Sequence, residues 1–499
     1  MLEASIDALY SLFQPMSILG LLAGILFGIV SGALPGGGLH GMVILLSFAF
    51  QIDPVVLLPI AMGMMAVTAT SDTIPAILLG IPGDTAAQAT ILDGYQLARQ
   101  GRAGEALGAA YTSSLIGGFV GVAALWVTIP IARIFINAFS SAEFFMLSFL
   151  GIVVVGIVSS GAVIKGLLAG ALGLGISFIG FDEVSGIPRL TFDIQYLWDG
   201  IPVTAVVIGL FAIPEMIDLV AGDNTNFWNK NNNMIEQSNK GRWTGIKHAL
   251  NNKFLIFRAS LLGVLVGIMP GIGGSVANWL AYGQAAITEK GASKTFGTGD
   301  IRGVIAPESA NNAVDGASLI PTLTFGVPGS VKTSLLLAIF FIIGLQPGPS
   351  MLNENLDMTM LIILSLLFAN IIAVIIVLFF TPQIAKVCFV RPHVLAPVTI
   401  GLLLLVGYNS RASMGDLFLI MAFAVLGWVM KVAKWPRPPI IIALVLGPIL
   451  EKYLYISVST YGWAMFMRPI VWIIAVVAFL MVFLFMKGQN NVKGELGKK

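Results

Sequence analysis

The chain contains 499 residues, of which 57% are hydrophobic and only 10% are charged, and its mean hydropathy is +0.92. Soluble domains carry roughly 25% charged residues, so this composition excludes a soluble globular protein and predicts an all-α polytopic membrane protein. An outer-membrane barrel would need alternating polar and apolar residues, whereas this chain has long apolar runs. The formal net charge of +2 gives no reason to expect a nucleic-acid partner, and the single cysteine, Cys388, excludes an internal disulfide.

The N-terminal segment, residues 1–14, is mildly acidic and lacks the basic start of a signal peptide, so we expect the first apolar helix to stay in the membrane. No lysine or arginine precedes Arg99, which by the positive-inside rule places the N-terminus outside. The first helix is expected from about Met16 to a break at residues 35–38. A second apolar segment, residues 55–70, leads into a polar break at 68–73 and then a hairpin.

The remaining segments follow from runs of apolar residues separated by charged loops. Further apolar segments are expected at residues 104–130, 144–158, 161–180 and 200–217. The loop 181–200 is acidic and is expected outside, whereas the Asn- and Lys-rich stretch 222–253 is expected in the cytoplasm. We divide the chain into a first transmembrane repeat (1–221), a hydrophilic cytoplasmic linker (222–253), a second transmembrane repeat (254–463), and an extra C-terminal helix with a basic cytoplasmic tail (464–499).

The two halves share their helix-breaking residues in the same order. Residues 74–84 (IPAILLGIPGD) match residues 320–330 (IPTLTFGVPGS) in every Pro, Gly and Pro-Gly position, and residues 32–38 (GALPGGG) correspond to residues 267–273 (GIMPGIG). By their flanking charges, the two halves begin on opposite sides of the membrane. This pattern predicts two inverted-topology repeats with broken helices and re-entrant hairpins, and about 12 membrane helices, as in secondary transporters.

The stretch 306–330 is rich in Ser, Thr, Asn and Gly and contains three prolines. Irregular backbone at membrane depth is tolerated where it lines a cavity, so this stretch and its twin predict a binding site. An organic carboxylate would be held by free backbone N–H groups at half-helix N-termini. The substrate-binding candidates are Ser71, Thr73, Gly80, Pro82, Gly83, Ser309, Asn311, Asn312, Ser318, Gly326, Pro328, Gly329 and Lys332. Adding a side chain at Gly83 or Gly329 is expected to block transport more than folding.

A coupling cation, Na⁺ or H⁺, is expected beside the same breaks, because opened carbonyls and intramembrane acids suit cations. No other cofactor and no metal cluster is expected. The candidates are Pro35, Gly36, Pro270 and Gly271, which open helices, and the acids Asp72, Asp84, Glu308 and Asp315. Alternatives stay open: the breaks could be packing kinks, Lys332 could extend to a membrane interface, and any one acid could form a structural salt bridge, for example with Arg302.

Several motifs together resemble the large membrane subunit of tripartite tricarboxylate transporters, the TctA family. They are Leu34-Pro-Gly, residues 76–83 (AILLGIPG), Leu92-Asp-Gly-Tyr followed by residues 100–104 (QGRAG), residues 307–312 (PESANN) and residues 344–349 (GLQPGP). The resemblance covers nearly the whole chain. It implies uptake of organic carboxylates across the bacterial inner membrane, where the outside N-terminus expected from the charges would be periplasmic. It also implies two partners, a small four-helix membrane subunit (TctB type) and a periplasmic solute-binding protein (TctC type).

The chain departs from the family pattern at residues 69–73 (ATSDT) and 80–84 (GIPGD), within the predicted site, so the identity of the carboxylate stays open. Three other functions compete with the tripartite transporter. Residues 297–300 (GTGD) match a motif of intramembrane aspartyl proteases, but no second aspartate has a matching context, so we predict that the chain is not an enzyme. A channel and a stand-alone ion-coupled carboxylate carrier are the remaining alternatives.

Overall fold

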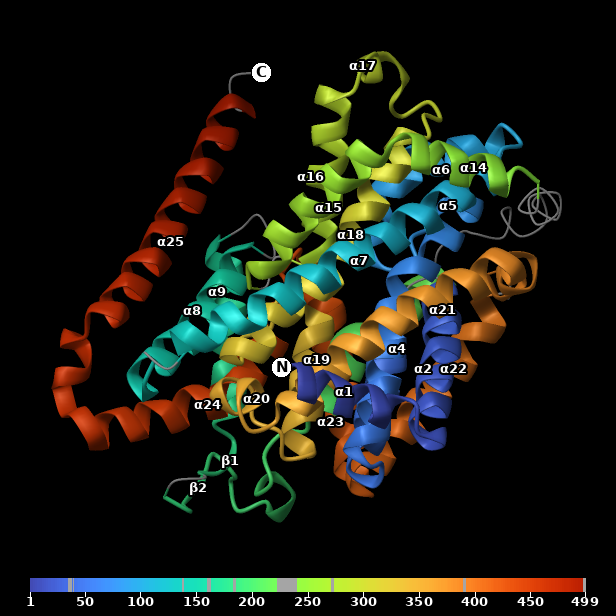
Figure 1. Ribbon diagram of the computed structural model, residues 1–499. Coiled ribbons are helices and arrows are strands. Elements are labelled where there is room, and N and C mark those ends of the chain that lie inside the picture. Colours follow the sequence, from blue (N-terminus) through green and yellow to red (C-terminus); the bar gives the residue numbers. More distant parts are fainter. Residues whose placement is uncertain are drawn as a thin grey trace.

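The computed structural model describes residues 1–34, 38, 40–136, 139–158, 163–182, 185–221, 240–270, 273–388 and 392–496. Within these residues the chain is almost entirely helical (Figure 1). Their one sheet is a short antiparallel pair, β1 (Gly180–Phe181) and β2 (Pro188–Arg189), in which Gly180 lies opposite Arg189. The predicted all-α class is confirmed.

The helices of the first half are interrupted mainly at Gly and Pro. They are α1 (Leu2–Leu12), α2 (Pro15–Ala33), α3 (His40–Phe48), η1 (Ala49–Gln51), α4 (Pro54–Ser71), α5 (Thr73–Leu79), η2 (Thr85–Ala87), α6 (Gln88–Arg99), α7 (Ala103–Ile136), α8 (Ser141–Val158), α9 (Val163–Ser177), η3 (Gln195–Leu197), α10 (Val203–Val207), the π-helical η4 (Ile208–Ala212) and α11 (Ile213–Ala221).

The helices of the second half follow the stretch 222–239, which lies outside the described residues. They are α14 (Arg242–Asn251), α15 (Lys253–Ile268), α16 (Gly273–Thr288), α17 (Ala292–Thr295), α18 (Arg302–Phe325), α19 (Val331–Ile342), α20 (Pro349–Leu352), α21 (Leu356–Cys388), α22 (Pro392–Arg411), α23 (Met414–Val432), α24 (Pro438–Tyr461), η5 (Gly462–Met467) and α25 (Pro469–Leu496). The last helix begins later than the predicted residue 464, because residues 462–467 form a 3₁₀ turn.

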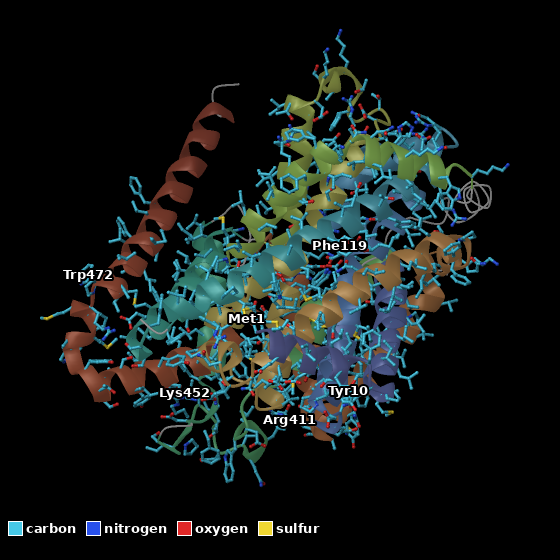
Figure 2. All side chains as sticks on the ribbon, viewed as in Figure 1. Met1, Tyr10, Phe119, Arg411, Lys452 and Trp472 are labelled. Atoms are coloured by element: carbon cyan, nitrogen blue, oxygen red, sulfur yellow. The ribbon has the colours of Figure 1, made fainter. Side chains whose placement is uncertain are left out.

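Six helical stretches in the described part of the chain are long and apolar enough to cross a membrane, or seven if the bent pair α14 and α15 counts as one span. They are Pro15–Ala33, Pro54–Leu79, Ala103–Ile134, Leu356–Cys388, Met414–Val432 and Pro438–Met467. Large apolar side chains such as Tyr10, Phe119 and Trp472 lie exposed on the helices (Figure 2). Helices that are apolar on their outer faces suit a bilayer, so the protein is a multi-pass membrane protein. The predicted total of about 12 helices stays a prediction.

Helix α18 lies at the centre of the bundle, and its residues from Gly303 to Thr324 are all buried. It packs against α7, α15 and α16. Glycines allow this close approach: a Cβ at Gly117 of α7 would lie 2.1 Å from the carbonyl oxygen of Ser309, and a Cβ at Gly263 of α15 would lie 2.5 Å from that of Ala310. Small residues let membrane helices approach in this way.

The predicted irregular backbone is much shorter in the structure than in the sequence analysis. Residues 306–325 belong to the continuous helix α18 despite Pro307 and Pro321, and residues 74–79 form the helix α5 rather than a hairpin. Each proline removes only one helical hydrogen bond, which the packed surroundings of a buried membrane helix tolerate. The breaks are therefore confined to residues 80–84 and 326–330.

Segments that the charge pattern assigns to opposite sides of the membrane lie at opposite ends of the bundle. The C-terminal end of α25 and the helices α14 and α17 lie toward one end of the molecule, whereas β1 and β2 of the acidic loop lie at the opposite end (Figure 1). The assignment of these two ends to the cytoplasm and the periplasm stays a prediction.

Candidate functional site

The two Gly-x-Pro-Gly segments have the same backbone conformation. Gly80 ends α5 with φ 69° and ψ 22°, and Gly326 ends α18 with φ 68° and ψ 20°. The amide of the residue after each glycine, Ile81 or Val327, donates to the carbonyl of a proline six residues earlier, Pro75 or Pro321. Glycine is favoured here because the left-handed conformation closes a helix end without a clash at Cβ.

After each break the chain starts a new helical segment from an extended residue. Asp84 (φ −131°, ψ 161°) accepts a hydrogen bond from the amide of Thr85, and Ser330 (φ −153°, ψ 172°) forms a capping box with Thr333. Several backbone N–H groups at the breaks are therefore already used in capping, including those of Ile81, Gly326 and Val327. Binding of the ligand by other backbone amides around residues 80–83 and 326–329 stays a prediction.

Gly83 and Gly329 are required by packing. A Cβ at Gly83 would lie 2.2 Å from the carbonyl oxygen of Gly32, and a Cβ at Gly329 would lie 2.8 Å from Cα of Ser318. Both contacts are with backbone atoms, which cannot move aside cheaply. The expectation that a side chain at these positions would spare folding is therefore wrong, because the added atoms would push apart the helices that form the site. Pro82 and Pro328 precede these glycines within the same short breaks.

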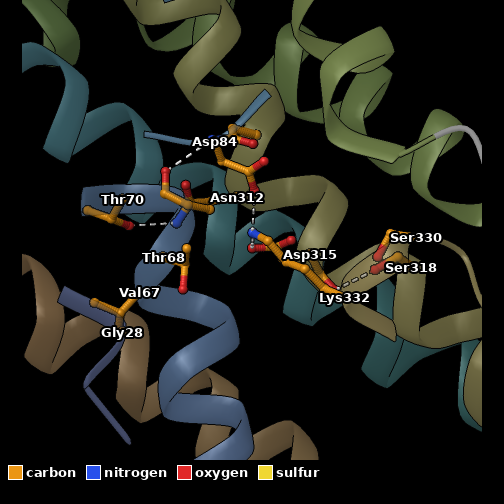
Figure 3. A network of polar contacts seen from close by, with 12 residues as sticks. Gly28, Val67, Thr68, Thr70, Asp84, Asn312, Asp315, Ser318, Ser330 and Lys332 are labelled. Carbon is orange, nitrogen blue, oxygen red and sulfur yellow. Dashed lines mark hydrogen bonds and ion pairs between the residues drawn. The ribbon is translucent and has the colours of Figure 1, made fainter. Parts of the chain in front are cut away.

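The breaks bring a buried lysine between two aspartates. The Nζ atom of Lys332 lies 3.7 Å from a carboxylate oxygen of Asp84 and 3.5 Å from one of Asp315 (Figure 3). Asp84 comes from the first half of the chain, whereas Asp315 on α18 and Lys332 on α19 come from the second. Only 7% of the surface of Lys332 is exposed, so the alternative that this side chain extends to a membrane interface is wrong.

Asp72 lies next to this trio, between α4 and α5, and is fully buried. Neither of its carboxylate oxygens has a hydrogen-bond partner. The Cβ of Asp72 lies 2.9 Å from the position that a Cβ on Gly83 would occupy, so the break of the first half packs directly on this residue. A buried carboxylate without partners is costly, and this one is accordingly a candidate to receive a proton or a cation.

Glu308 on α18 is also fully buried, but its carboxylate is satisfied by hydroxyl groups. It accepts hydrogen bonds from Thr73 (2.6 Å), Thr90 (2.6 Å) and Ser114 (3.1 Å), which belong to α5, α6 and α7. The salt bridge considered with Arg302 does not form, because that arginine pairs with Asp300 at 2.6 Å. Glu308 thus joins three helices of the first half to the central helix of the second.

The predicted asparagines also join the halves. The side-chain amide of Asn311 donates to the backbone carbonyl of Ala69 (3.0 Å). The side-chain amide of Asn312 donates to the hydroxyl of Thr70 (2.9 Å) and to the side-chain oxygen of Asn370 (3.1 Å). The side-chain oxygen of Asn312, Oδ1, is buried and has no hydrogen-bond partner. A free acceptor at this point can bind a cation or a donor group.

The three predicted serines donate to backbone carbonyls within the helices. The Ser71 hydroxyl donates to the backbone carbonyls of Gly28 (3.1 Å) and of Val67 in its own helix (3.0 Å). The Ser309 hydroxyl donates to the carbonyl of Ile305 (2.7 Å), and the Ser318 hydroxyl donates to that of Asp315 (3.1 Å). These hydroxyls are therefore engaged in this conformation.

The predicted cation positions at the upstream breaks fall mostly outside the described residues, because Pro35, Gly36 and Gly271 are not described. Pro270 lies two residues after the end of α15. Gly38 connects the first upstream break to the site, since a Cβ there would lie 2.8 Å from the carboxyl carbon of Asp84. In the described part of the chain, no group of three or more His, Cys, Asp or Glu side chains could hold a metal ion.

Asp93, which belongs to the Leu92-Asp-Gly-Tyr motif, has its hydrogen-bond partners in the other half of the chain. One carboxylate oxygen of Asp93 accepts the amides of Gly297 (2.8 Å), Gly299 (2.8 Å) and Asp300 (2.9 Å), and the other accepts the hydroxyl of Tyr282 (2.9 Å). The GTGD segment considered as a protease motif is therefore the cradle for Asp93. Thr90, Ser114 and Asn370 were also missed, because their partners are distant in sequence.

Comparison with known proteins agrees with this architecture. The model of the tripartite tricarboxylate transporter TctA family matches residues 18–442. The chain belongs to this family. This TctA-family chain is 30% identical over 454 residues to an uncharacterized 52.8 kDa protein in the TAR-I ttuC' 3'region of Agrobacterium vitis, covering 88% of the chain and 86% of the relative.

A second relative is an uncharacterized protein in the TAR-II ttuC' 3'region of Agrobacterium vitis. It is 32% identical over 195 residues, which cover 38% of this chain and 79% of the relative. No solved structure matches the chain. The family match makes this protein a subunit of a transporter, and the site described above is the candidate for its transport chemistry.

Proposed function

We propose that this TctA-family chain is the large transmembrane subunit of a secondary, cation-coupled, binding-protein-dependent tripartite transporter that imports organic carboxylates. The observation that carries the proposal is the buried Lys332 between Asp84 and Asp315. A cation buried within an apolar bundle, where the helices of both halves break, offers an anionic substrate a specific partner. The protein is a carrier and not an enzyme.

The substrate carboxylate binds between the break at residues 80–84 and the break at residues 326–330. There the Lys332 ammonium faces it, and the buried amides of Asn311 and Asn312 lie on the neighbouring turns of α18. The coupling cations bind at the aspartates beside the two breaks, and the unpartnered carboxylate of Asp72 lies next to them. Na⁺ and H⁺ both suit an unpartnered buried carboxylate.

Alternating access is the proposed transport mechanism. The matched conformations at Gly80 and Gly326 support two related halves, and the charge pattern supports opposite orientations of these halves in the bacterial inner membrane. Movement of one half against the other would expose the polar contacts between them first to the periplasm and then to the cytoplasm. A small membrane subunit and a periplasmic solute-binding protein complete the transporter.

The test is uptake into proteoliposomes that contain this chain together with its small membrane subunit, with a panel of labelled carboxylates and imposed Na⁺ or H⁺ gradients. The proposal predicts uptake that saturates, shows counterflow, and requires both the binding protein and a cation gradient. Uptake without the binding protein would favour the stand-alone carrier, and flux without saturation or counterflow would favour a channel. Failure of every carboxylate in the panel to be transported would contradict the proposal.

A further inference from the structure

The Lys332 trio is held at longer distances than most ion pairs of the described chain. Three other partly buried pairs are close contacts: Arg189–Glu451 at 2.5 Å, Arg258–Glu289 at 2.8 Å and Arg437–Glu215 at 2.8 Å. The distances of 3.7 and 3.5 Å around Lys332 exceed the length of a charge-assisted hydrogen bond, about 2.7–2.9 Å. The Lys332 ammonium is therefore more deeply buried than these three guanidinium groups, and yet it lies farther from its carboxylate partners.

The trio is also short of positive charge. One lysine faces two aspartates, so the three groups carry a formal charge of −1 when all are ionised, and Asp72 beside them makes −2. An incoming carboxylate would add further negative charge in a bundle from which water is largely excluded. Burying that excess without compensation is strongly unfavourable, so the anion cannot simply join the cluster as it stands.

We propose that Lys332 is an internal substitute for the coupling cations and exchanges partners during transport. In the structure its ammonium balances Asp84 and Asp315. When cations bind at these two carboxylates, one to each, the ammonium is released and pairs with the carboxylate of the substrate. The substrate class is thus an organic anion that enters together with at least two monovalent cations. Lys332 is the residue that makes binding of the anion conditional on binding of the cations.

Two features of the neighbouring residues favour such an exchange. The Asp315 oxygen nearest to Lys332 is buried and makes no hydrogen bond, only the 3.5 Å ion pair with this ammonium, so a cation can replace the lysine there. Glu308, two turns away from Asp315 on α18, is already satisfied by three hydroxyls and does not need a cation. The cation positions therefore fall to the aspartates at the two breaks.

The first experiment needs neither the substrate nor the partner subunits. The purified chain is titrated with Na⁺, and its thermal unfolding midpoint is followed at several pH values for the native protein, Lys332→Met and the control Glu215→Gln. Removing the internal cation should leave the aspartates open to external cations. The unfolding midpoint of Lys332→Met should begin to rise at an Na⁺ concentration about tenfold lower than that of the native protein does, because a bound ligand at concentration L stabilises the folded state by RT ln(1 + L/Kd).

If protons take the cation positions instead, Lys332→Met should gain stability on acidification relative to the native protein, independently of Na⁺, which equally supports the exchange. Glu215 is ion-paired away from the trio, so Glu215→Gln should respond to Na⁺ and pH as the native protein does. The inference is overturned if Lys332→Met and the native protein respond alike to both Na⁺ and pH. This readout does not depend on the proposed substrate, so its failure would leave carboxylate transport untouched.

The cation number is tested in the reconstituted transporter and rests on the proposed function. Uptake by the native protein should rise with cation concentration with a Hill slope near two, one for each aspartate around Lys332. Asp315→Asn, which keeps the shape of the side chain, should lower that slope by about one. An unchanged slope in Asp315→Asn would contradict the assignment of a cation to this residue.

Discussion

The hydroxyl donors around Glu308 give a prediction whose size can be worked from the structure. Thr73→Val keeps the volume and branching of the side chain but removes a 2.6 Å hydrogen bond to a fully buried carboxylate. A hydrogen bond to a charged group contributes about 1.5–3 kcal/mol, against about 0.5–1.5 kcal/mol for a neutral pair. We therefore expect Thr73→Val to destabilise the folded chain by about 1.5–3 kcal/mol if Glu308 is ionised.

The assay is equilibrium unfolding in mixed micelles at increasing denaturing detergent, followed by tryptophan fluorescence. Thr112→Val is the matched control, because the Thr112 hydroxyl bonds only the carbonyl of Gly108 in its own helix. The double variant with Glu308→Gln closes a thermodynamic cycle. A loss in Thr73→Val no larger than that in Thr112→Val, or strict additivity with Glu308→Gln, would refute the view that Glu308 fastens the two halves together.

Three further variants or sets of variants test other parts of the structure. Asp93→Ala should destabilise the chain by roughly 3 kcal/mol, because three loop amides and the Tyr282 hydroxyl lose their acceptor; equilibrium unfolding measures this, and a loss below about 0.5 kcal/mol would contradict the cradle. Gly83→Leu should reduce the yield of folded protein on size-exclusion chromatography, whereas Gly175→Leu, where a Cβ meets nothing within 4 Å, should not; equal yields would show that Gly83 is not a packing position. In a Cys388→Ala background, an impermeant thiol reagent should label Asp7→Cys in intact spheroplasts but not Lys247→Cys or Gln489→Cys; labelling at position 247 would contradict the predicted topology.

Some of the fold could be predicted from sequence because it depends on local chemistry. Long apolar runs predict the membrane helices, and the matched Gly and Pro residues predict helix breaks, which the structure has at Gly80 and Gly326. From sequence alone, Lys332 could lie at the binding site or extend to a membrane interface, and nothing in the sequence favoured one position over the other. That choice depends on how deeply α19 is buried, which no local pattern determines.

The errors have one physical origin, which is that polar residues in a packed membrane bundle have several ways to be satisfied. Ser, Thr and Asn between residues 306 and 325 were taken as signs of an opened backbone, yet Ser309 and Thr322 bond carbonyls of their own helix. Asp93 illustrates the same difficulty, because its acceptor atoms are filled by a loop about 200 residues away in sequence. Such partners become visible only when the tertiary structure places them.

The central claim is that the transported anion binds at Lys332, and a structure of the complete transporter with carboxylate and cation bound tests it most directly. In that structure the carboxylate should lie against the Lys332 ammonium, and cations should replace the ammonium at Asp84 and Asp315. Another cavity contains basic residues, the one lined by Arg189 and Lys452 beside β1, β2 and α24. Carboxylate found there, with Lys332 still between its two aspartates, would contradict the account.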